Sequence, residues 1–316
     1  MRSMFSVRRA IGAGTVVALG FCGSAASGSV RPVVTSSPSS AALIYVSDES
    51  HGVVSAYNAK TGTQVEQLTG FSEPEGMTTD SRANLYVADF NMAKVFVFPP
   101  AQTSPSLTLA VPNQYPNDVA VSNLGEIAVT SVAPGGASGG PSNVNFYKKG
   151  STSPYASIST PFVQEMLGCA YDTNGNLYVV GIGSAGDPSG GANVVEVTGS
   201  GKKKVVKNLF NTDIVSPGSI QVAPNGDYLV LDTAADAVLE FEPSSNVLVG
   251  ATRIAGASAA RWFALEKDGR SLWLLNDIVS GSGAMRYAYP KGGSPKQTVA
   301  TSNTSYGIAL TPAPMP

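Results

Sequence analysis

Short stretches rich in β-branched and aromatic residues recur along most of the chain, and Gly, Asn, Asp or Pro flanks nearly every one. Such stretches are typical of β-strands between tight turns. One family has the form Asn84-Leu-Tyr-Val-Ala-Asp89. Its six members are residues 43–48, 84–89, 126–131, 176–181, 227–232 and 271–276. The regular return of one strand motif predicts a repeat protein.

A second strand family accompanies the first. Its members are residues 75–80, 117–122, 167–172, 217–222, 261–266 and 306–311. In every complete pair, the spacing from this strand to the next strand of the first family is nearly constant, which predicts a hairpin. Asn174-Gly175 and Asn225-Gly226 supply the residues that tight hairpin turns favour.

Two further strands follow in each repeat, as in residues 94–98 and 106–109. Six repeats of four antiparallel strands predict an all-β fold, a six-bladed β-propeller over residues 42–312. The last member of the second family, residues 306–311, has no following partner, and the first repeat lacks an inner strand. We therefore expect the C-terminal strand to pair with the N-terminal blade and close the ring.

The motifs Pro74-Glu-Gly-Met-Thr-Thr-Asp80 and Pro116-Asn-Asp-Val-Ala-Val121, with Asn84-Leu-Tyr-Val-Ala-Asp89, resemble those of NHL-repeat and SMP-30/gluconolactonase-like propellers. The resemblance covers nearly all of residues 42–312. It implies a ligand site on the rim of the channel where the inner strands begin. It does not imply one activity, because these propellers include hydrolases, lyases and binding modules.

In the gluconolactonase-like enzymes an acidic residue, an Asn and an Asp at inner-strand entries hold a divalent metal. The residues at the equivalent entries of this chain are Glu75, Asn117, Leu167, Pro217, Arg261 and Tyr306. Glu75 and Asn117 supply two of the three ligand types, and no Asp follows. Water and backbone carbonyls complete many calcium sites, so a calcium site on these two residues remains an open prediction.

Other polar and aromatic residues are expected on the same rim. His51 and Asp118 are candidates for moving protons in a hydrolase. Arg261, Trp262 and Tyr306 are candidates for binding a flat ligand. His51 also fits an ordinary solvated loop residue, since the chain has a single histidine.

Two Gly-rich inserts, residues 133–142 and 183–192, are expected as loops on that rim, either as a mobile wall over a ligand or as tolerated padding. Acidic and amide residues also end the strands of the first family. We expect them to accept backbone N–H groups in the following turn: Asp48, Asp89, Asp232, Asn276 and Asp277.

The N-terminus has the layout of a secretory signal over residues 1–26, with arginines ahead of the apolar run Ala10–Phe21. That run is shorter than the roughly 20 residues that span a bilayer. A Ser/Pro/Gly-rich linker over 27–41 and a tail over 313–316 flank the propeller. Lipidation at Cys22 remains an alternative to free secretion. The expected location is periplasmic or extracellular.

Charged residues make up only 13% of the chain and the net charge is −2. This composition lacks the clustered Lys and Arg that nucleic acid binding requires. Only Cys169 lies in the folded region, so no disulfide is expected inside it. The sequence favours a monomeric binding module for an unknown small molecule, glycan or protein. A calcium-dependent lactonase or esterase and a purely structural envelope role remain alternatives.

Overall fold

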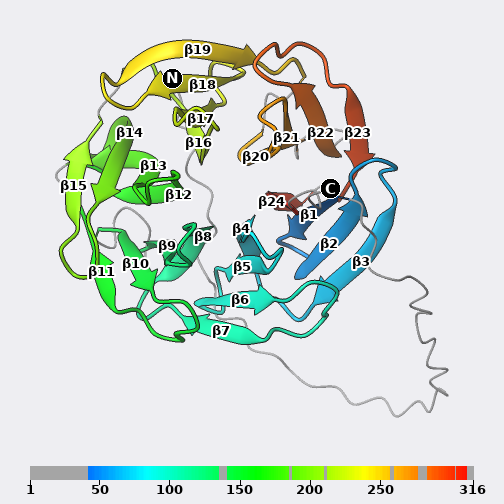
Figure 1. Ribbon diagram of the computed structural model, residues 1–316, viewed down its shortest axis with the longest axis horizontal. Helices are drawn as coiled ribbons and strands as arrows, with labels where there is room; N and C mark the ends of the chain where they lie inside the picture. The colour runs from blue at the N-terminus through cyan, green and yellow to red at the C-terminus, as the bar shows by residue number, and fades with distance from the viewer. Residues whose placement is uncertain are drawn as a thin grey trace, which may run out of the picture. The chain divides into compact units, whose positions relative to one another are not determined.

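The computed structural model describes residues 42–134, 141–184, 187–209, 212–256, 260–276, 283–302 and 304–311. All regular elements of these residues are strands, and they form six four-stranded antiparallel sheets (Figure 1). The predicted signal peptide, linker, lipidation site and C-terminal tail lie outside the described residues.

Each sheet is one blade, and its strands follow one another from the channel outward. Blade I contains β24 (Ser305–Leu310), β1 (Leu43–Asp48), β2 (Val53–Asn58) and β3 (Gln64–Thr69). Blade II contains β4 (Pro74–Thr79), β5 (Leu85–Asp89), β6 (Lys94–Phe98) and β7 (Leu107–Ala110). Blade III contains β8 (Tyr115–Val121), β9 (Ile127–Val132), β10 (Asn143–Tyr147) and β11 (Ala156–Ile158).

Blade IV contains β12 (Glu165–Tyr171), β13 (Leu177–Ser184), β14 (Asp187–Thr198) and β15 (Val205–Asn208). Blade V contains β16 (Pro217–Val222), β17 (Tyr228–Asp232), β18 (Ala237–Glu242) and β19 (Val247–Arg253). Blade VI contains β20 (Phe263–Leu265), β21 (Ser271–Asn276), β22 (Gly283–Ala288) and β23 (Gln297–Ala300). The blades surround a central channel, which confirms the predicted six-bladed propeller.

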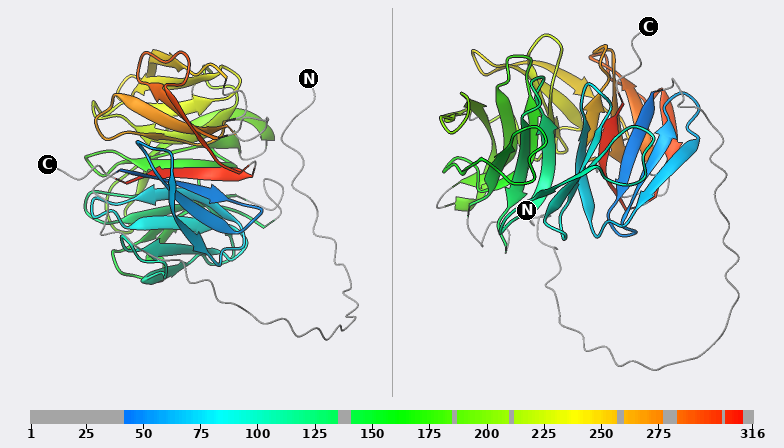
Figure 2. Two further views of the ribbon diagram at one scale, coloured as in Figure 1. Left: turned by 90° about the vertical axis from the view of Figure 1, so that its right-hand side faces the viewer. Right: turned by 60° about the horizontal axis from the view of Figure 1, so that its bottom comes forward.

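The ring closes as the sequence predicts. β24 pairs antiparallel with β1, with Ile44 opposite Leu310 and Val46 opposite Ile308, and the two strands lie side by side in Figure 2. The amide N–H of Leu43 also donates to Thr311 Oγ1 at 2.7 Å. Because β24 belongs to the same sheet as β1–β3, strands from both ends of the propeller share one blade.

The core lies between blades, where the strand aromatics pack. Tyr178 of blade IV stacks on Tyr228 of blade V, with ring centroids 5.4 Å apart. Trp273, which occupies the strand position of Tyr178 in blade VI, is also buried. These positions therefore serve packing between blades, as their repetition suggests.

The aspartates that end the second strands accept backbone N–H groups, as predicted. Asp89 accepts from Met92 in the following turn at 3.0 Å and from Ser72, ahead of β4, at 2.8 Å. Asp232 makes the same pair of contacts with Ala234 and Val215. Each aspartate thus joins the start of one strand to the end of its neighbour. Asn276 differs from the prediction: its Nδ2 donates to the carbonyl of Gly256 at 2.8 Å, and its Oδ1 accepts no hydrogen bond within the described residues. Asp277 lies outside the described residues.

Two predictions need correction. Pro217 pairs with Asp232 as Pro74 pairs with Asp89. The residue equivalent to Glu75 is therefore Gly218, not Pro217. Ser219, and not Gly218, occupies the position of Gly76, so aligning the two strands on their glycines shifts blade V by one residue. The second Gly-rich insert is not a loop in its described part: β13 and β14 extend as a hairpin with Ser184 opposite Asp187.

Candidate functional site in the central channel

One residue of each inner strand lies at the same level of the ring, at or beside the bulge. In blade order these residues are Gly307, Gly76, Asp118, Gly168, Ser219 and Trp262. Neighbouring inner strands approach closely here. A Cβ on Gly307 would lie 2.0 Å from the carbonyl oxygen of Glu75. Glycine is needed at this position because any larger residue would overlap the next strand.

Asp118 connects blade III to blade IV at this level. Its Oδ2 accepts the amide N–H of Cys169 at 2.9 Å, and the residue is only 4% exposed. Burial raises the pKa of Asp118 from 3.8 to about 8, although the amide N–H groups of Cys169 and Val119 favour the charged form. The carboxyl group is therefore mostly protonated at neutral pH.

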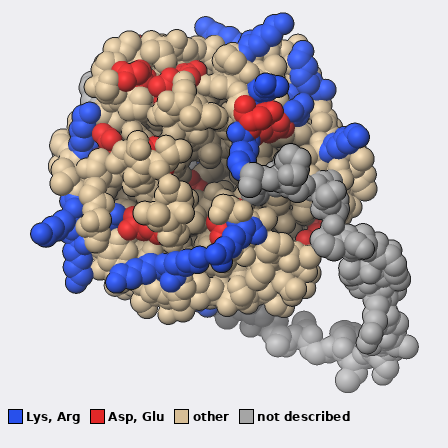
Figure 3. Space-filling view, viewed as in Figure 1, with Lys and Arg blue, Asp and Glu red and all other residues tan. Residues whose placement is uncertain are grey.

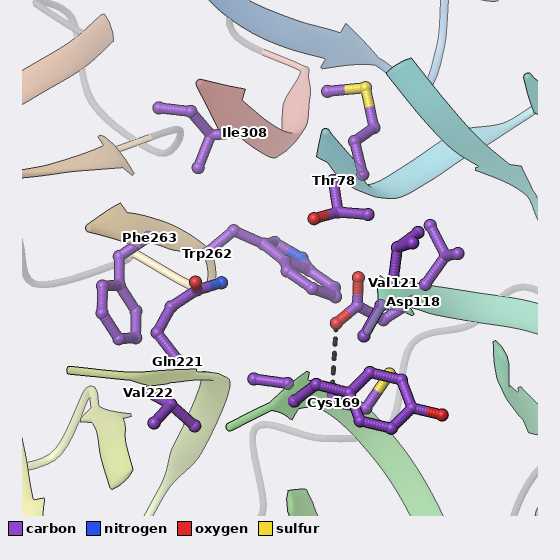
Figure 4. Close-up of a pocket in the computed structure, with 14 residues that line it drawn as sticks. Thr78, Asp118, Val121, Cys169, Gln221, Val222, Trp262, Phe263 and Ile308 are labelled. Carbon is purple, nitrogen blue, oxygen red and sulfur yellow. Dashed lines mark hydrogen bonds between the residues drawn. The ribbon is translucent and has the colours of Figure 1, made fainter. Parts of the chain in front are cut away.

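A cavity of about 120 Å³ lies beside Asp118 in the channel. Figure 4 shows the 14 residues of its wall, with Asp118, Thr78, Trp262 and Gln221 directed toward its centre. The wall contains no Lys, Arg or His. The space-filling view in Figure 3 shows that one face of the propeller is hollowed at its centre. The site is a small, largely polar chamber without a positive charge.

Three polar side chains of the wall make no hydrogen bond within the described residues. They are the hydroxyl of Thr78, the amide of Gln221 and the indole N–H of Trp262, in blades II, V and VI. The polar atoms of these three side chains are not fully buried, so each faces the cavity or solvent. A ligand that reached this point would find donors and acceptors that no protein group uses.

Two other wall residues are not chemically available. Burial and the nearby Asp118 carboxyl raise the pKa of the Cys169 thiol well above its usual range, which keeps it from acting as a nucleophile. Tyr171 donates its hydroxyl to Glu126 at 2.8 Å, and Lys204 binds the same carboxylate at 2.8 Å. This contact fixes the tyrosine as a rigid part of the wall.

Glu75 and Asn117 lie one residue earlier in their strands and are each 1% exposed. The side-chain amide of Asn117 donates to the carbonyl of Leu167, while its Oδ1 is buried without a hydrogen bond in the described part of the chain. Neither residue lines the cavity. They occupy equivalent positions of adjacent blades, as expected for the predicted pair.

Of the two aromatic residues predicted to bind a ligand, only Trp262 lines the cavity. Trp262 lines the cavity and contacts Tyr306, with ring centroids 5.9 Å apart. Tyr306 is half-buried outside the cavity wall, and Arg261 is exposed. The structure therefore places Trp262 with Asp118 in the cavity and leaves Arg261 and Tyr306 nearer the rim.

His51 lies apart from the cavity. Its side chain is 68% exposed and its Nδ1 lies 2.9 Å from Asp48 Oδ2. Asp48 also accepts the hydroxyl of Thr304 at 2.6 Å. Burial alone would raise the pKa of Asp48, but hydrogen bonds from Ser302, Thr304 and His51 outweigh it and lower the pKa to about 2. These contacts of Asp48 join the turn after β1 to the residues just before β24 in blade I.

Thr78 and Gln221 were not predicted from the sequence. Both occupy repeated inner-strand positions, where other blades carry small or apolar residues such as Ala120 and Ala170. Nothing in a single repeat distinguishes them. Only the convergence of several blades brings their side chains to one cavity.

No group of three or more His, Cys, Asp and Glu residues suited to a metal ion occurs in the described ranges. The same ranges contain no helix that could cross a bilayer.

The six four-stranded blades around a central channel define a six-bladed β-propeller. Comparisons with solved structures agree with this fold. A protein of unknown function from Bacteroides caccae is similar with a TM-score of 0.64 at 13% identity, over 86% of this chain and 99% of its own. A chain of the nidogen/laminin complex gives 0.67 at 12% identity, with coverage of 86% and 99%. A functionally unknown protein from Desulfotomaculum acetoxidans gives 0.56 at 15%, with coverage of 85% and 99%.

At these identities the likeness concerns the fold alone. No protein-family model matches the chain, and no curated protein matches it.

Proposed function

We propose that the protein is an exported binding propeller that holds a small uncharged polar molecule in its central channel. The observation that carries this proposal is the convergence of Thr78, Gln221 and Trp262 on one cavity with unused hydrogen-bonding groups. Unused groups facing a cavity are a common feature of ligand sites.

The charge of the wall supports an uncharged ligand. No basic side chain lines the cavity, so an anion would lack a partner there. The raised pKa of Asp118 keeps its carboxyl protonated at neutral pH, so the wall carries no net negative charge. A neutral carboxyl group both donates and accepts hydrogen bonds, as do hydroxyl and amide groups.

The cavity limits the size of the molecule. A cavity of about 150 Å³ holds one benzene molecule, so about 120 Å³ accommodates roughly five non-hydrogen atoms. We therefore expect a compound of that size, or one end of a longer ligand.

Thermal unfolding with a panel of small uncharged polyols, amides and heterocycles tests this function. A compound at 100 times its Kd should add about 2.7 kcal/mol of stability. Thr78→Val and Gln221→Leu should abolish the gain, while Thr103→Val, at an exposed position outside the cavity, should retain it. If a stabilising compound acts equally on all three variants, it does not bind in the channel.

Export is proposed from the N-terminal sequence, where arginines precede the apolar run Ala10–Phe21. The mass of the mature protein recovered from producing cells tests it. A new N-terminus near residue 27 supports secretion, a lipid-modified Cys22 supports the anchored form, and an intact leader argues against export.

A metal-assisted lactonase of the gluconolactonase type is the second candidate. The buried Oδ1 of Asn117, without a hydrogen bond in the described part, is the observation that favours it. Glu75 occupies the equivalent position in the next blade, and oxygen atoms of this kind suit calcium. His51 or Asp118 would then move protons.

Thermal unfolding in EDTA and then in calcium, magnesium, manganese or zinc tests this candidate. A rise in Tm that disappears in both Glu75→Ala and Asn117→Ala would support it and justify assays with lactones and esters. An unchanged Tm with every metal would exclude it.

A further inference from the structure

The Asp118 carboxyl group occupies a space that two glycines of the neighbouring inner strands leave open. A Cβ on Gly76 would lie 2.5 Å from Asp118 Oδ1, and a Cβ on Gly168 would lie 3.5 Å from Oδ2. Any side chain at position 76 would therefore displace the carboxyl group. The two glycines allow a whole carboxyl group to lie at the edge of the cavity.

The two oxygens of this carboxyl group have different surroundings. Oδ2 accepts the amide N–H of Cys169 at 2.9 Å, and Figure 4 shows the other oxygen directed into the cavity. Burial raises the pKa of Asp118 to about 8, so the group is a neutral acid at pH 6. Because Oδ2 already accepts a hydrogen bond, the proton belongs on Oδ1, where it can be donated to a ligand.

Asp118 is the wall residue whose charge changes with pH in the neutral range. The other ionisable wall residues are Cys169 and Tyr171 of blade IV. Burial, with the nearby Asp118, raises the pKa of the Cys169 thiol, and burial, with the nearby Glu126, raises the pKa of Tyr171. The wall residues from blades I, II, V and VI carry no ionisable side chain, and Glu75 lies outside the wall.

The polar groups of the wall call for a ligand with both acceptors and donors. The indole N–H of Trp262 can only donate, and the neutral acid of Asp118 offers its O–H. Thr78 and Gln221 each carry a side-chain oxygen that can accept. A ligand that satisfies all four needs a carbonyl oxygen for the first pair and two N–H groups for the second. A primary carboxamide combines these in one small planar group.

We propose that the cavity binds a small primary carboxamide, whose carbonyl oxygen accepts from Asp118 and Trp262 and whose N–H groups donate to Thr78 and Gln221. This inference names the class of ligand for the channel and rests on the binding function proposed above. Acetamide is within the limit of roughly five non-hydrogen atoms that the cavity volume sets.

Four molecules of nearly the same shape test the class: acetamide, acetone, acetate and acetamidinium. The NMR signals of the indole N–H groups report binding, because the chain has two tryptophans. Trp273 Nε1–H donates to Glu266 at 2.9 Å, so its signal is an internal control, and Trp262→Phe identifies the other signal. At pH 6 acetamide should shift the Trp262 signal with a Kd of the order of 1 mM. The other three should bind at least about tenfold more weakly.

The proton of Asp118 provides a second test. At pH 9 about one tenth of the protein would retain it, so the affinity for acetamide should fall about tenfold, and acetamidinium should bind more tightly. Asp118→Asn should bind acetamide equally at pH 6 and pH 9, because its amide oxygen can accept from Cys169 while its NH₂ group donates to the ligand. Asp236→Asn, at an exposed position outside the cavity, is the matched control and should keep the pH dependence.

The outcomes separate this inference from the binding function. Tighter binding of acetone than of acetamide, or equal binding of acetamide by the unmodified protein at both pH values, would overturn the carboxamide and leave an uncharged ligand in place. The same holds if a different uncharged compound binds in a manner that depends on Thr78. A preference for acetate or acetamidinium at pH 6, or no response to any compound, would contradict both proposals.

Discussion

Blades III and V use the same contact to hold the next blade, but with different side chains. Asp118 Oδ2 accepts the amide N–H of Cys169 at 2.9 Å, and Ser219 Oγ accepts that of Phe263 at 3.0 Å. The hydrogen bond between neighbouring inner strands therefore needs only one neutral acceptor, which a serine supplies. The aspartate brings a second oxygen and an ionisable group to the cavity wall. The contact between the blades does not require this second oxygen or its ionisation.

The largest expected effect concerns the charge that Asp118 has and Ser219 lacks. The folded-state pKa of about 8 lies above the ordinary value of 3.8, so the folded protein binds the extra proton between these values. Its free energy of unfolding should therefore fall as pH rises from about 4 to about 8. At about 1.4 kcal/mol per pKa unit, the upper limit is about 6 kcal/mol.

Asp118→Asn should remove this pH dependence. At pH 9 the variant should unfold at a higher urea concentration than the unmodified protein. Urea titrations across the pH range would measure both effects. Ser219→Ala is the control, because it should leave the pH dependence intact. Parallel curves for the unmodified protein and Asp118→Asn would show that Asp118 is ionised at neutral pH.

The next largest effect on stability is expected at Gly76, which faces Asp118, and at Gly168, which faces Ser219. A Cβ on Gly76 would lie 2.5 Å from Asp118 Oδ1, whereas a Cβ on Gly168 would lie 3.2 Å from the Cα of Ser219. Gly76→Ala should cost about 3 kcal/mol, at the upper end of overpacking costs, and Gly168→Ala clearly less. Equal losses in urea unfolding would mean that the two junctions are equally tight.

The shared hydrogen bond is expected to contribute less. Ser219→Ala leaves the buried N–H of Phe263 without its acceptor and should cost about 1–2 kcal/mol. Asp118→Ser gives blade III the hydroxyl acceptor that Ser219 provides in blade V. It should therefore lower the free energy of unfolding less than Asp118→Ala does. If serine and alanine at position 118 give the same unfolding midpoint, the hydrogen bond to Cys169 contributes nothing measurable.

The smallest effect on stability belongs to the cavity wall. Thr78 makes no hydrogen bond within the described residues, so Thr78→Val should change the free energy of unfolding by less than about 0.5 kcal/mol. The same change should remove ligand binding. A variant with a large loss of stability would indicate a structural role for this hydroxyl.

The fold could be predicted from sequence because the propeller repeats one physical pattern. The motif of Asn84–Asp89 returns in each blade, and turn glycines mark the hairpins, so six weak signals support one another. Ring closure followed from one unpaired strand at each end. The misplacement of Pro217 came from aligning Gly218 with Gly76, whereas the strand register places Ser219 at the position of Gly76.

The candidate site was harder to predict because it belongs to no single repeat. Asp118 and Trp262 were identified as unusual residues at inner-strand entries, but as parts of a rim. Their position deeper in the channel follows from how the six inner strands converge. Thr78 and Gln221 carry no local signal, since a polar residue on an inner strand is also compatible with ordinary solvent contact.

The closure of blade I has a consequence for how the protein is made. β1, β2 and β3 are synthesised first, yet the inner strand of their sheet, β24, is synthesised last of all the strands. The first blade therefore stays incomplete throughout translation, and the ring cannot lock until β24 has left the ribosome.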